Sequence, residues 1–300
     1  MKQKTLNLLE IQRRFSTEEA CREHLFQIRW PEGFQCPKCD HHQAYVITDR
    51  HLHQCANCHH QVSVTAGTIF HKTHTSLVKW FLAIYLVSHD KRGVSASFLA
   101  RELDLGYKTA WLLLHKIRKA MRDRDAKYQL AGIVELDEAF FGAPKEGGKR
   151  GRGTEKAMVL VALTLTQAGH PEYVKFRVIP NVKSETLIAF AKEEVTSGST
   201  IVSDDYRSYK QLASNGYAHD AKKFDPLQNP DHLKWIHTII GNAKAYIAGT
   251  YHGLNPKYLE TYLDEFGYRF NRRHFVGEWF DRLLAASTSA KTITLAELKG

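Results

Sequence analysis

The sequence lacks any apolar run long enough to cross a membrane. The longest candidate, Leu77 to Val87, is interrupted by Lys79 and falls short of the roughly eighteen residues that a membrane-spanning helix needs. The opening residues, Met1 to Lys4, are not followed by the apolar core of a secretion signal. Low-complexity tracts are also missing. We therefore expect a cytoplasmic protein without a membrane partner.

The sequence has fewer acidic than basic residues. Forty-two Lys and Arg stand against 32 Asp and Glu, which gives a formal net charge of +10 and a pI of about 9.3. This imbalance favours a polyanionic partner but does not identify one. A length of 300 residues predicts two or three domains, and a hydrophobic fraction of 43% is enough to form packed cores.

Cysteine is scarce, but four of the five cysteines form one pattern. Cys36, Cys39, Cys55 and Cys58 stand as two C-x-x-C pairs that are fifteen residues apart. Four thiolates with this spacing suit tetrahedral Zn²⁺, whereas two disulfides would require a secreted protein. A four-sulfur site leaves no open position for water, so this Zn²⁺ is structural and any chemistry lies elsewhere. Cys21 needs no role.

The flanks of the cysteines predict a zinc ribbon over residues 31–70, preceded by a helical N-terminal segment over residues 1–30. Six histidines crowd the ribbon: His41, His42, His51, His53, His59 and His60. They are either spare metal ligands or polar surface residues. A segment of about 40 residues buries too little core to fold alone, so the metal supplies its stability.

Residues 71–125 predict a helical DNA-binding region. An apolar helix over residues 76–88 is followed by a helix, a short turn at residues 104–106 and a second helix, which is the order of a helix-turn-helix. Lys108, Lys116 and Lys119, with His115 and Arg118, take the polar positions of the second helix. We expect the three lysines to contact double-stranded DNA; an ordinary helical hairpin with a solvated basic face is the alternative.

The composition changes after the helical region, and residues 130–285 predict a mixed sheet with helices packed on it. Strands are expected over residues 133–141, 157–165, 173–179, 200–203 and 217–224, and helices over residues 183–195 and 206–213. Between the first two strands lies a glycine-rich segment that contains Lys149, Arg150 and Arg152. It is a surface loop, a basic flap that follows phosphates, or both.

Two acids occupy strand positions where folding gives no reason for a polar side chain. Asp137 interrupts an apolar run, and Asp204 follows directly on the strand over residues 200–203. Half-buried carboxylates are costly unless they are paired or bind a metal. If the two strands are neighbours, the acids converge and suit Mg²⁺ ions that act on a phosphodiester.

At this point the chain resembles a family, the zinc-ribbon group of bacterial insertion-sequence transposases. The likeness covers roughly residues 15 to 275 and is carried by the ribbon and by the stretches at residues 134–138, 201–209, 237–244, 249–252 and 262–273. The resemblance implies a ribonuclease-H-like catalytic domain with a metal site of the DDE type. The first and second acids of that site map to Asp137 and Asp204.

The third position departs from the DDE pattern. Relatives with a glutamate carry it five residues after the histidine that matches His237, and here that place holds Asn242, as in a branch whose triad reads Asp-Asp-Asn. An Asn oxygen ligates Mg²⁺ without charge, so Asp205, His237 or Glu265 would have to compensate. The alternative roles are a helix-terminal or turn residue for Asn242 and a structural histidine for His237.

The resemblance therefore implies a DNA transposase that cleaves strands at the ends of its element and transfers them to target DNA. Structural Zn²⁺, catalytic Mg²⁺ or Mn²⁺, terminal inverted repeats and a homo-oligomer on DNA belong to that expectation. Lys244 would contact the DNA backbone as a point charge. A non-catalytic DNA-binding relative and a metal-dependent nuclease without strand transfer are the alternatives.

Overall fold

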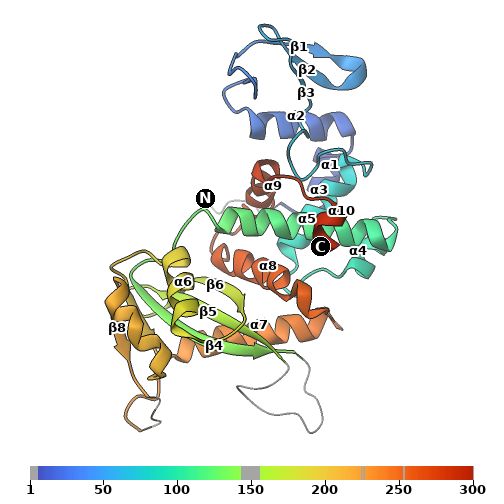
Figure 1. Ribbon diagram of the computed structural model, residues 1–300. Coiled ribbons are helices and arrows are strands. Elements are labelled where there is room, and N and C mark those ends of the chain that lie inside the picture. The colour runs from blue at the N-terminus through green and yellow to red at the C-terminus, as the bar shows by residue number, and fades with distance from the viewer. Residues whose placement is uncertain (1–5, 143–155, 224, 226, 253, 300) are drawn as a thin grey trace. The chain divides into compact units, whose positions relative to one another are not determined.

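The computed structural model describes residues 6–142, 156–223, 225, 227–252 and 254–299 (Figure 1). The chain divides into two compact units, one formed by residues 1–124 with 275–300 and the other by residues 125–274. The second unit therefore ends before residue 285, where the sequence places the end of the catalytic domain. The reason is the helix α9 (Trp279–Ser289). Its Phe280 packs against Phe15 and Phe81 of the first unit.

The first unit begins with two short helices and the ribbon. Helices α1 (Leu8–Arg14) and α2 (Glu18–Arg29) are capped by Asn7 and Thr17, whose side chains accept hydrogen bonds from the first turn. Strands β1 (Ala44–Ile47), β2 (Leu52–Cys55) and β3 (Gln61–Val62) form an antiparallel sheet, with the 3₁₀ turn η1 (Thr48–Arg50) between the first two. His53 packs among the rings of Phe26, Trp30 and Phe34, which makes it a packing residue.

The remaining helices of the first unit include the predicted helix-turn-helix. Helix α3 (Leu77–His89) is followed by α4 (Ala96–Glu102), a turn and α5 (Tyr107–Asp125). Asp104 adopts a left-handed conformation in that turn, at φ 47°, which suits a short polar side chain. The short helix α10 (Leu295–Lys299) ends the described chain. Among the helices of the described residues, none is both long and apolar enough to span a bilayer.

The second unit is built on a five-stranded mixed sheet. Its strands are β4 (Ile133–Phe141), β5 (Ala157–Leu165), β6 (Pro171–Ile179), β7 (Thr200–Ser203) and β8 (Ala218–Ala221). They lie in the order β6-β5-β4-β7-β8, with β4, β5 and β6 antiparallel and with β7 and β8 parallel to β4. This is the predicted ribonuclease-H-like sheet, in which β4 stands at the centre.

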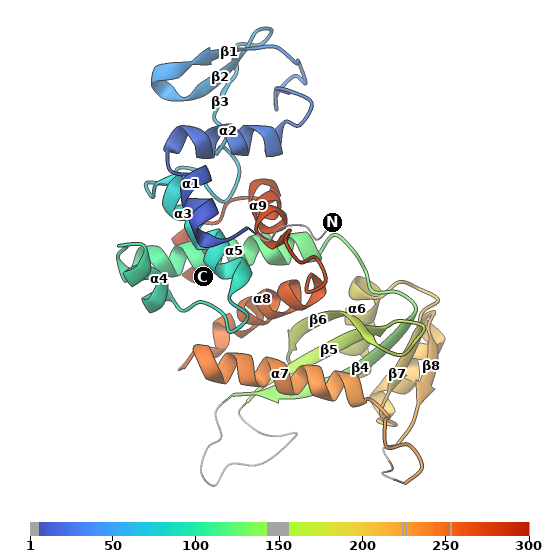
Figure 2. The same ribbon diagram turned by 180° about the vertical axis from the view of Figure 1, so that it is seen from behind.

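Helices cover both faces of this sheet, as Figure 2 shows. Helix α6 (Ser184–Glu194) and the 3₁₀ segment η2 (Arg207–Asn215) pack on one face, where Val134 and Leu136 of β4 point. Helices α7 (Lys234–Thr250) and α8 (Leu259–Asn271), joined through η3 (Pro256–Tyr258), pack on the other, against Ala139 and Phe141. Because side chains alternate along a strand, Asp137 points to the α7 face.

Candidate active site and DNA-binding residues

Asp137 lies on β4, and Asp204 lies directly after the neighbouring strand β7. Strands β4 and β7 are parallel, and Glu135 pairs with Val202. Asp137 stands two residues further along β4, and Asp204 is the first residue after β7 ends at Ser203. Residues two apart on a strand share a face, so Asp137 projects on the α7 side, and Asp204 directly follows the neighbouring strand. Each is only partly exposed.

Backbone amides hold both carboxylates in place. Oδ1 of Asp137 accepts from the N–H of Glu138 at 2.8 Å, and Oδ1 of Asp204 accepts from the N–H of Tyr206 at 3.1 Å. At the end of β7, His232 donates to the carbonyl of Ser203 at 3.1 Å. The site is therefore fixed by its own backbone, which leaves further carboxylate oxygens for other partners.

Tyr209 of η2 lies within reach of the same acids and was not among the residues that sequence reasoning selected. Its hydroxyl is buried and donates to a carboxylate oxygen of Glu138 at 2.8 Å. Burial raises the pKa of Tyr209 well above its usual value, and the negative charges of Glu138, Asp137 and Asp204 add to the effect. The pKa of Tyr209 thus depends on the charges of both aspartates. Its only sequence signal was its place in the family-like stretch at residues 201–209.

His237 is the side chain of α7 that reaches Asp137. Its Nε2 lies 3.1 Å from Oδ2 of Asp137, and the imidazole is 54% exposed whereas the carboxylate is 16% exposed. The hydrogen bond to Asp137 raises the pKa of His237; burial opposes this effect, and the charges of Asp137 and Glu135 add to it. His237 is therefore in direct contact with the first acid.

Glu135 explains why α7 begins where it does. The side chain is buried, and its Oε2 accepts from the backbone N–H of Ile236 in the first turn of α7 at 2.9 Å. Leu233, just before the helix, has a left-handed conformation and provides no side-chain cap. An acid from β4 thus replaces the missing cap and sets the helix start that presents His237 to Asp137. Sequence reasoning missed this role because the two residues are a hundred positions apart.

Asn242 lies on a different part of the α7 surface from His237. An α-helix turns by about 100° per residue, so Asn242 lies about 140° around α7 from His237. The flank that contacts β4 holds His237 and also Lys244, whose ammonium lies 5.6 Å from the ring centre of Phe141. Asn242 is exposed and lies away from that flank.

The other two predicted neighbours of the metal site lie in different surroundings. Asp205 is exposed and forms an ion pair with Lys210 at 3.4 Å. Glu265 of α8 is fully buried beside Arg269 at 3.3 Å and accepts from the Tyr251 hydroxyl at 3.5 Å. Tyr251 in turn packs on Tyr246. Tyr246 follows His237 by nine residues, which corresponds to about 14 Å along the axis of α7. Glu265 therefore belongs to a tyrosine cluster near the end of α7.

The basic residues of α5 divide into exposed and buried ones. Lys108 is exposed, and Lys119 forms an ion pair with Asp123. Lys116 is buried and donates to the carbonyl of Ile69 at 3.2 Å, so its predicted place on the polar, DNA-facing side is wrong. His115 and Arg118 are also buried. The reason is that α5 packs several of its faces, so hydrophobic periodicity alone does not identify its solvated side.

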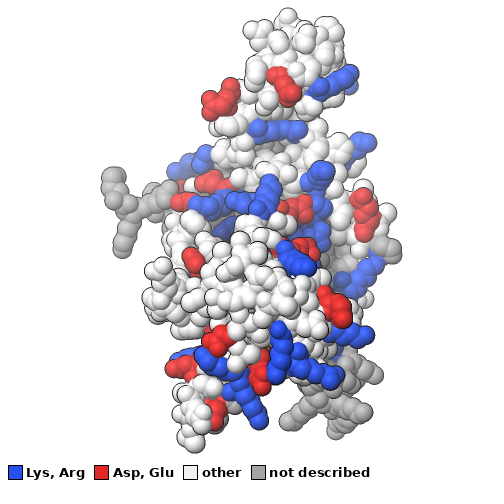
Figure 3. Space-filling model, turned by 60° about the vertical axis from the view of Figure 1, so that its left-hand side comes forward, with Lys and Arg blue, Asp and Glu red and all other residues white. Residues whose placement is uncertain are grey.

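Two groups of predicted DNA contacts remain. Lys244 is exposed, and burial and the charge of Lys156 lower its pKa, while Asp137 opposes this effect. Lys149, Arg150 and Arg152 lie outside the described residues. On the face shown in Figure 3, basic and acidic side chains are interspersed. Contacts with DNA on this face would therefore depend on particular lysines rather than on one continuous basic block.

The four cysteines of the ribbon form a compact cluster. Their Sγ atoms all lie within 4.8 Å of one another, and the pairs Cys36–Cys58 and Cys39–Cys55 are 3.6 Å apart. A tetrahedral Zn²⁺ with bonds of about 2.3 Å requires sulfurs about 3.8 Å apart, so the donor set fits this ion. With four sulfurs bound, the ion would have a structural role.

Comparison with known proteins decides the family. Residues 129–271 match the ISXO2-like transposase domain, and residues 16–61 match the transposase zinc-ribbon domain. The chain belongs to the zinc-ribbon insertion-sequence transposases. The two matched regions of this transposase contain the sheet with both aspartates and the four cysteines.

Two proteins and two solved structures are similar to this chain. A protein in transposable element ISH50 of Halobacterium salinarum is 26% identical over 258 residues, which cover 79% of each chain. A transposase-like protein of Haemophilus influenzae is 29% identical over 96 residues, which cover 31% of this transposase and 77% of that protein. Two solved structures of the Mos1 mariner transposase in paired-end complexes are 12% identical. They cover 70% of this chain and 78% and 79% of theirs, with TM-scores of 0.28 and 0.21.

Proposed function

We propose that this transposase binds the ends of its element, cleaves a strand there and transfers the end to target DNA. The observation that carries the proposal is the contact of His237 with Asp137 on the central strand, with Asp204 directly after the neighbouring parallel strand. Two fixed carboxylates that stay partly open to solvent are a donor set for Mg²⁺ or Mn²⁺. A bound cation would stabilise the negative charge that develops on the phosphodiester oxygens.

The chain's own residues supply position and charge. The amides of Glu138 and Tyr206 hold one oxygen of each aspartate, so the carboxylates are oriented before DNA arrives. Tyr209 donates to Glu138 and stays protonated beside the acids. The buried hydroxyl supports the site from the α6 side of the sheet without adding a further negative charge.

The third position belongs to His237 rather than Asn242 in this proposal. His237 already contacts Asp137 through Nε2, and a metal would replace the proton of that hydrogen bond; an imidazole nitrogen is a ligand that Mn²⁺ accepts and that Mg²⁺ takes less readily than oxygen. Asn242 would have to reach the site from the other side of α7. The Asp-Asp-Asn triad that the resemblance implies is therefore replaced by Asp137, Asp204 and His237.

Double-stranded DNA is the proposed partner of both units. Lys108 at the start of α5 is exposed and would contact phosphates of the terminal inverted repeats, and Lys244 would contact the strand beside the acidic site. Strand transfer needs two element ends and a target, so we include a homo-oligomer on DNA in the proposal.

The proposal is tested by cleavage of a duplex taken from the DNA that flanks the coding sequence. Asp137→Ala and Asp204→Ala each remove a ligating charge, so Mg²⁺-dependent or Mn²⁺-dependent cleavage should fall by orders of magnitude while DNA affinity is retained. Asp205→Ala is the matched control, because Asp205 is the adjacent acid but is exposed and paired with Lys210.

Three results would change the proposal. Full activity in Asp137→Ala would exclude a metal site at this position. Cleavage without joining of the freed end to a second duplex would favour a metal-dependent nuclease. Wild-type binding of the duplex without any cleavage would favour a DNA-binding protein that has lost catalysis.

A further inference from the structure

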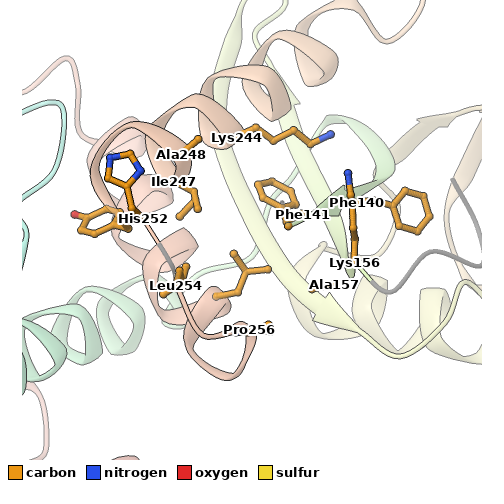
Figure 4. A pocket seen from close by; sticks show the side chains of 13 residues that line it. Phe140, Phe141, Lys156, Ala157, Lys244, Ile247, Ala248, His252, Leu254 and Pro256 are labelled. Atoms are coloured by element: carbon orange, nitrogen blue, oxygen red, sulfur yellow. The ribbon is translucent and has the colours of Figure 1, made fainter. Parts of the chain in front are cut away.

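The second unit contains a cavity of about 500 Å³ that the acidic site does not use. It lies between the end of β4, the start of β5, α7 and the segment that leads to α8 (Figure 4). Its walls include Phe141, Ile247, Leu254, Pro256 and Leu259. Both the size and the apolar, aromatic lining are those of a small-molecule or nucleobase site.

Two lysines line the same cavity. Lys156 directly precedes β5 and Lys244 belongs to α7, and Figure 4 shows their ammonium ends beside the rings of Phe140 and Phe141. Lys244 lies over the Phe141 ring at 5.6 Å. Burial and the charge of Lys156 lower the pKa of Lys244, so the two cations lie within electrostatic reach of each other. An apolar pocket beside two cations matches a ligand that has a flat apolar part and an attached anion.

The cavity continues the flank of α7 that faces the acidic site. This flank holds His237, Lys244 and Ala248, and the last two follow His237 by seven and eleven residues. These separations correspond to about 10 Å and about 16 Å along the helix axis. One strand of DNA advances about 3.4 Å per nucleotide, so the cavity lies about three to five nucleotides from the strand position at His237.

We propose that this cavity receives a nucleobase that is unstacked from the DNA, while Lys156 and Lys244 contact the phosphates beside it. The proposal rests on the proposed function, because it needs DNA held at Asp137 and Asp204. Stacking on Phe141 would compensate for part of the missing base stacking, and the paired cations favour the nucleotide backbone over an uncharged apolar ligand.

The test uses end-containing duplexes in which one base pair at a time is replaced by a mismatch near the cleavage site. A mismatch at the extruded position removes the cost of unpairing, so wild-type protein should bind that duplex several-fold more tightly than the fully paired one. Ala248 is exposed and lines the cavity, so Ala248→Trp should fill the cavity and abolish this preference. Ala245→Trp is the matched control, because Ala245 is exposed on the same helix and does not line the cavity.

The outcomes separate the two proposals. Loss of the preference in Ala248→Trp, with the preference kept in Ala245→Trp, supports the base-binding cavity. If no mismatch tightens wild-type binding, or if Ala248→Trp keeps the preference, the cavity is not a base site even though wild-type protein cleaves the same duplexes. If wild-type protein neither binds nor cleaves them, the proposed function fails and the cavity proposal fails with it.

Discussion

The Nε2 of His237 lies 3.1 Å from Oδ2 of Asp137, which joins the first turn of α7 to the central strand of the sheet. This contact brings an imidazole to the first acid, whereas the resemblance implies Asn242 for the third position. Its charge depends on Asp137, whose hydrogen bond raises the pKa of the imidazole. His237 and Asn242 thus differ in their position around α7 as well as in residue type.

We expect His237→Ala to lower metal-dependent cleavage by about 10-fold to 100-fold, because it removes a group that touches the acid that we propose as a metal ligand. Asn242→Ala should stay within about twofold of wild type, since the side chain lies about 140° away around α7. Single-turnover cleavage of an end-containing duplex measures both. The reverse order of effects would return the third position to Asn242.

Glu135→Ala should lower the free energy of unfolding by about 1–3 kcal/mol, because it leaves the Ile236 amide without its buried acceptor. Cleavage should fall as well, since the start of α7 sets the position of His237. Glu135→Gln keeps an acceptor oxygen and should lose less of both. Urea denaturation and cleavage assays on the three proteins test this, and equal losses in the two variants would mean that the charge, not the cap, matters.

His115 makes the first unit sensitive to acid. Burial, with a smaller effect of Arg118, lowers the pKa of His115 to about 3, whereas an unfolded histidine titrates near 6.5. Between these values the unfolded chain binds more protons, so stability falls as the pH falls from about 6.5 towards 3, with a limiting slope of about 1.4 kcal/mol per pH unit.

The variant His115→Leu removes this titration and should flatten that part of the stability profile. Urea denaturation at pH 7 and pH 5 compares the two proteins. Equal losses of stability on acidification in wild type and variant would show that other groups cause the effect.

Lys108 and Lys116 should differ although they lie on one helix. Lys108→Ala should weaken DNA binding and reduce the slope of log affinity against log salt by about 0.9 for each phosphate that the protein no longer neutralises. Lys116→Met should leave the slope unchanged and lower stability, because the carbonyl of Ile69 loses its donor. Binding titrations at several salt concentrations decide between these results; equal slopes for Lys108→Ala and wild type would remove α5 from the interface.

Purified protein should hold close to one Zn²⁺, and Cys36→Ser should lose it and unfold the ribbon while residues 125–274 stay folded. Elemental analysis and hydrogen exchange measure the two parts of this expectation. Cys21→Ala is the control, since Cys21 is a buried thiol of α2 outside the cluster. Native, chelator-free protein without zinc would contradict the assignment.

The sequence by itself determined the features that depend on local spacing. Two C-x-x-C pairs predict the metal cluster because the ligands are close in the chain, and that cluster is confirmed. Alternating apolar residues predict the strands β4 to β7, and the order of elements predicts a mixed sheet, because both patterns reflect which faces are buried. Asp204 was recognisable for the same reason, as a polar residue directly after a buried strand.

Only the tertiary structure decided which distant side chains meet. The phase of α7 relative to β4 brings His237 into contact with Asp137, and the buried bond from Ile236 to Glu135 fixes that phase. The burial of Lys116 depends on the carbonyl of Ile69, which no periodicity in α5 reveals. Such contacts join residues many positions apart, and their energy comes from burial and hydrogen-bond geometry in the folded chain. A local pattern therefore predicts the elements but not the partners that their side chains find.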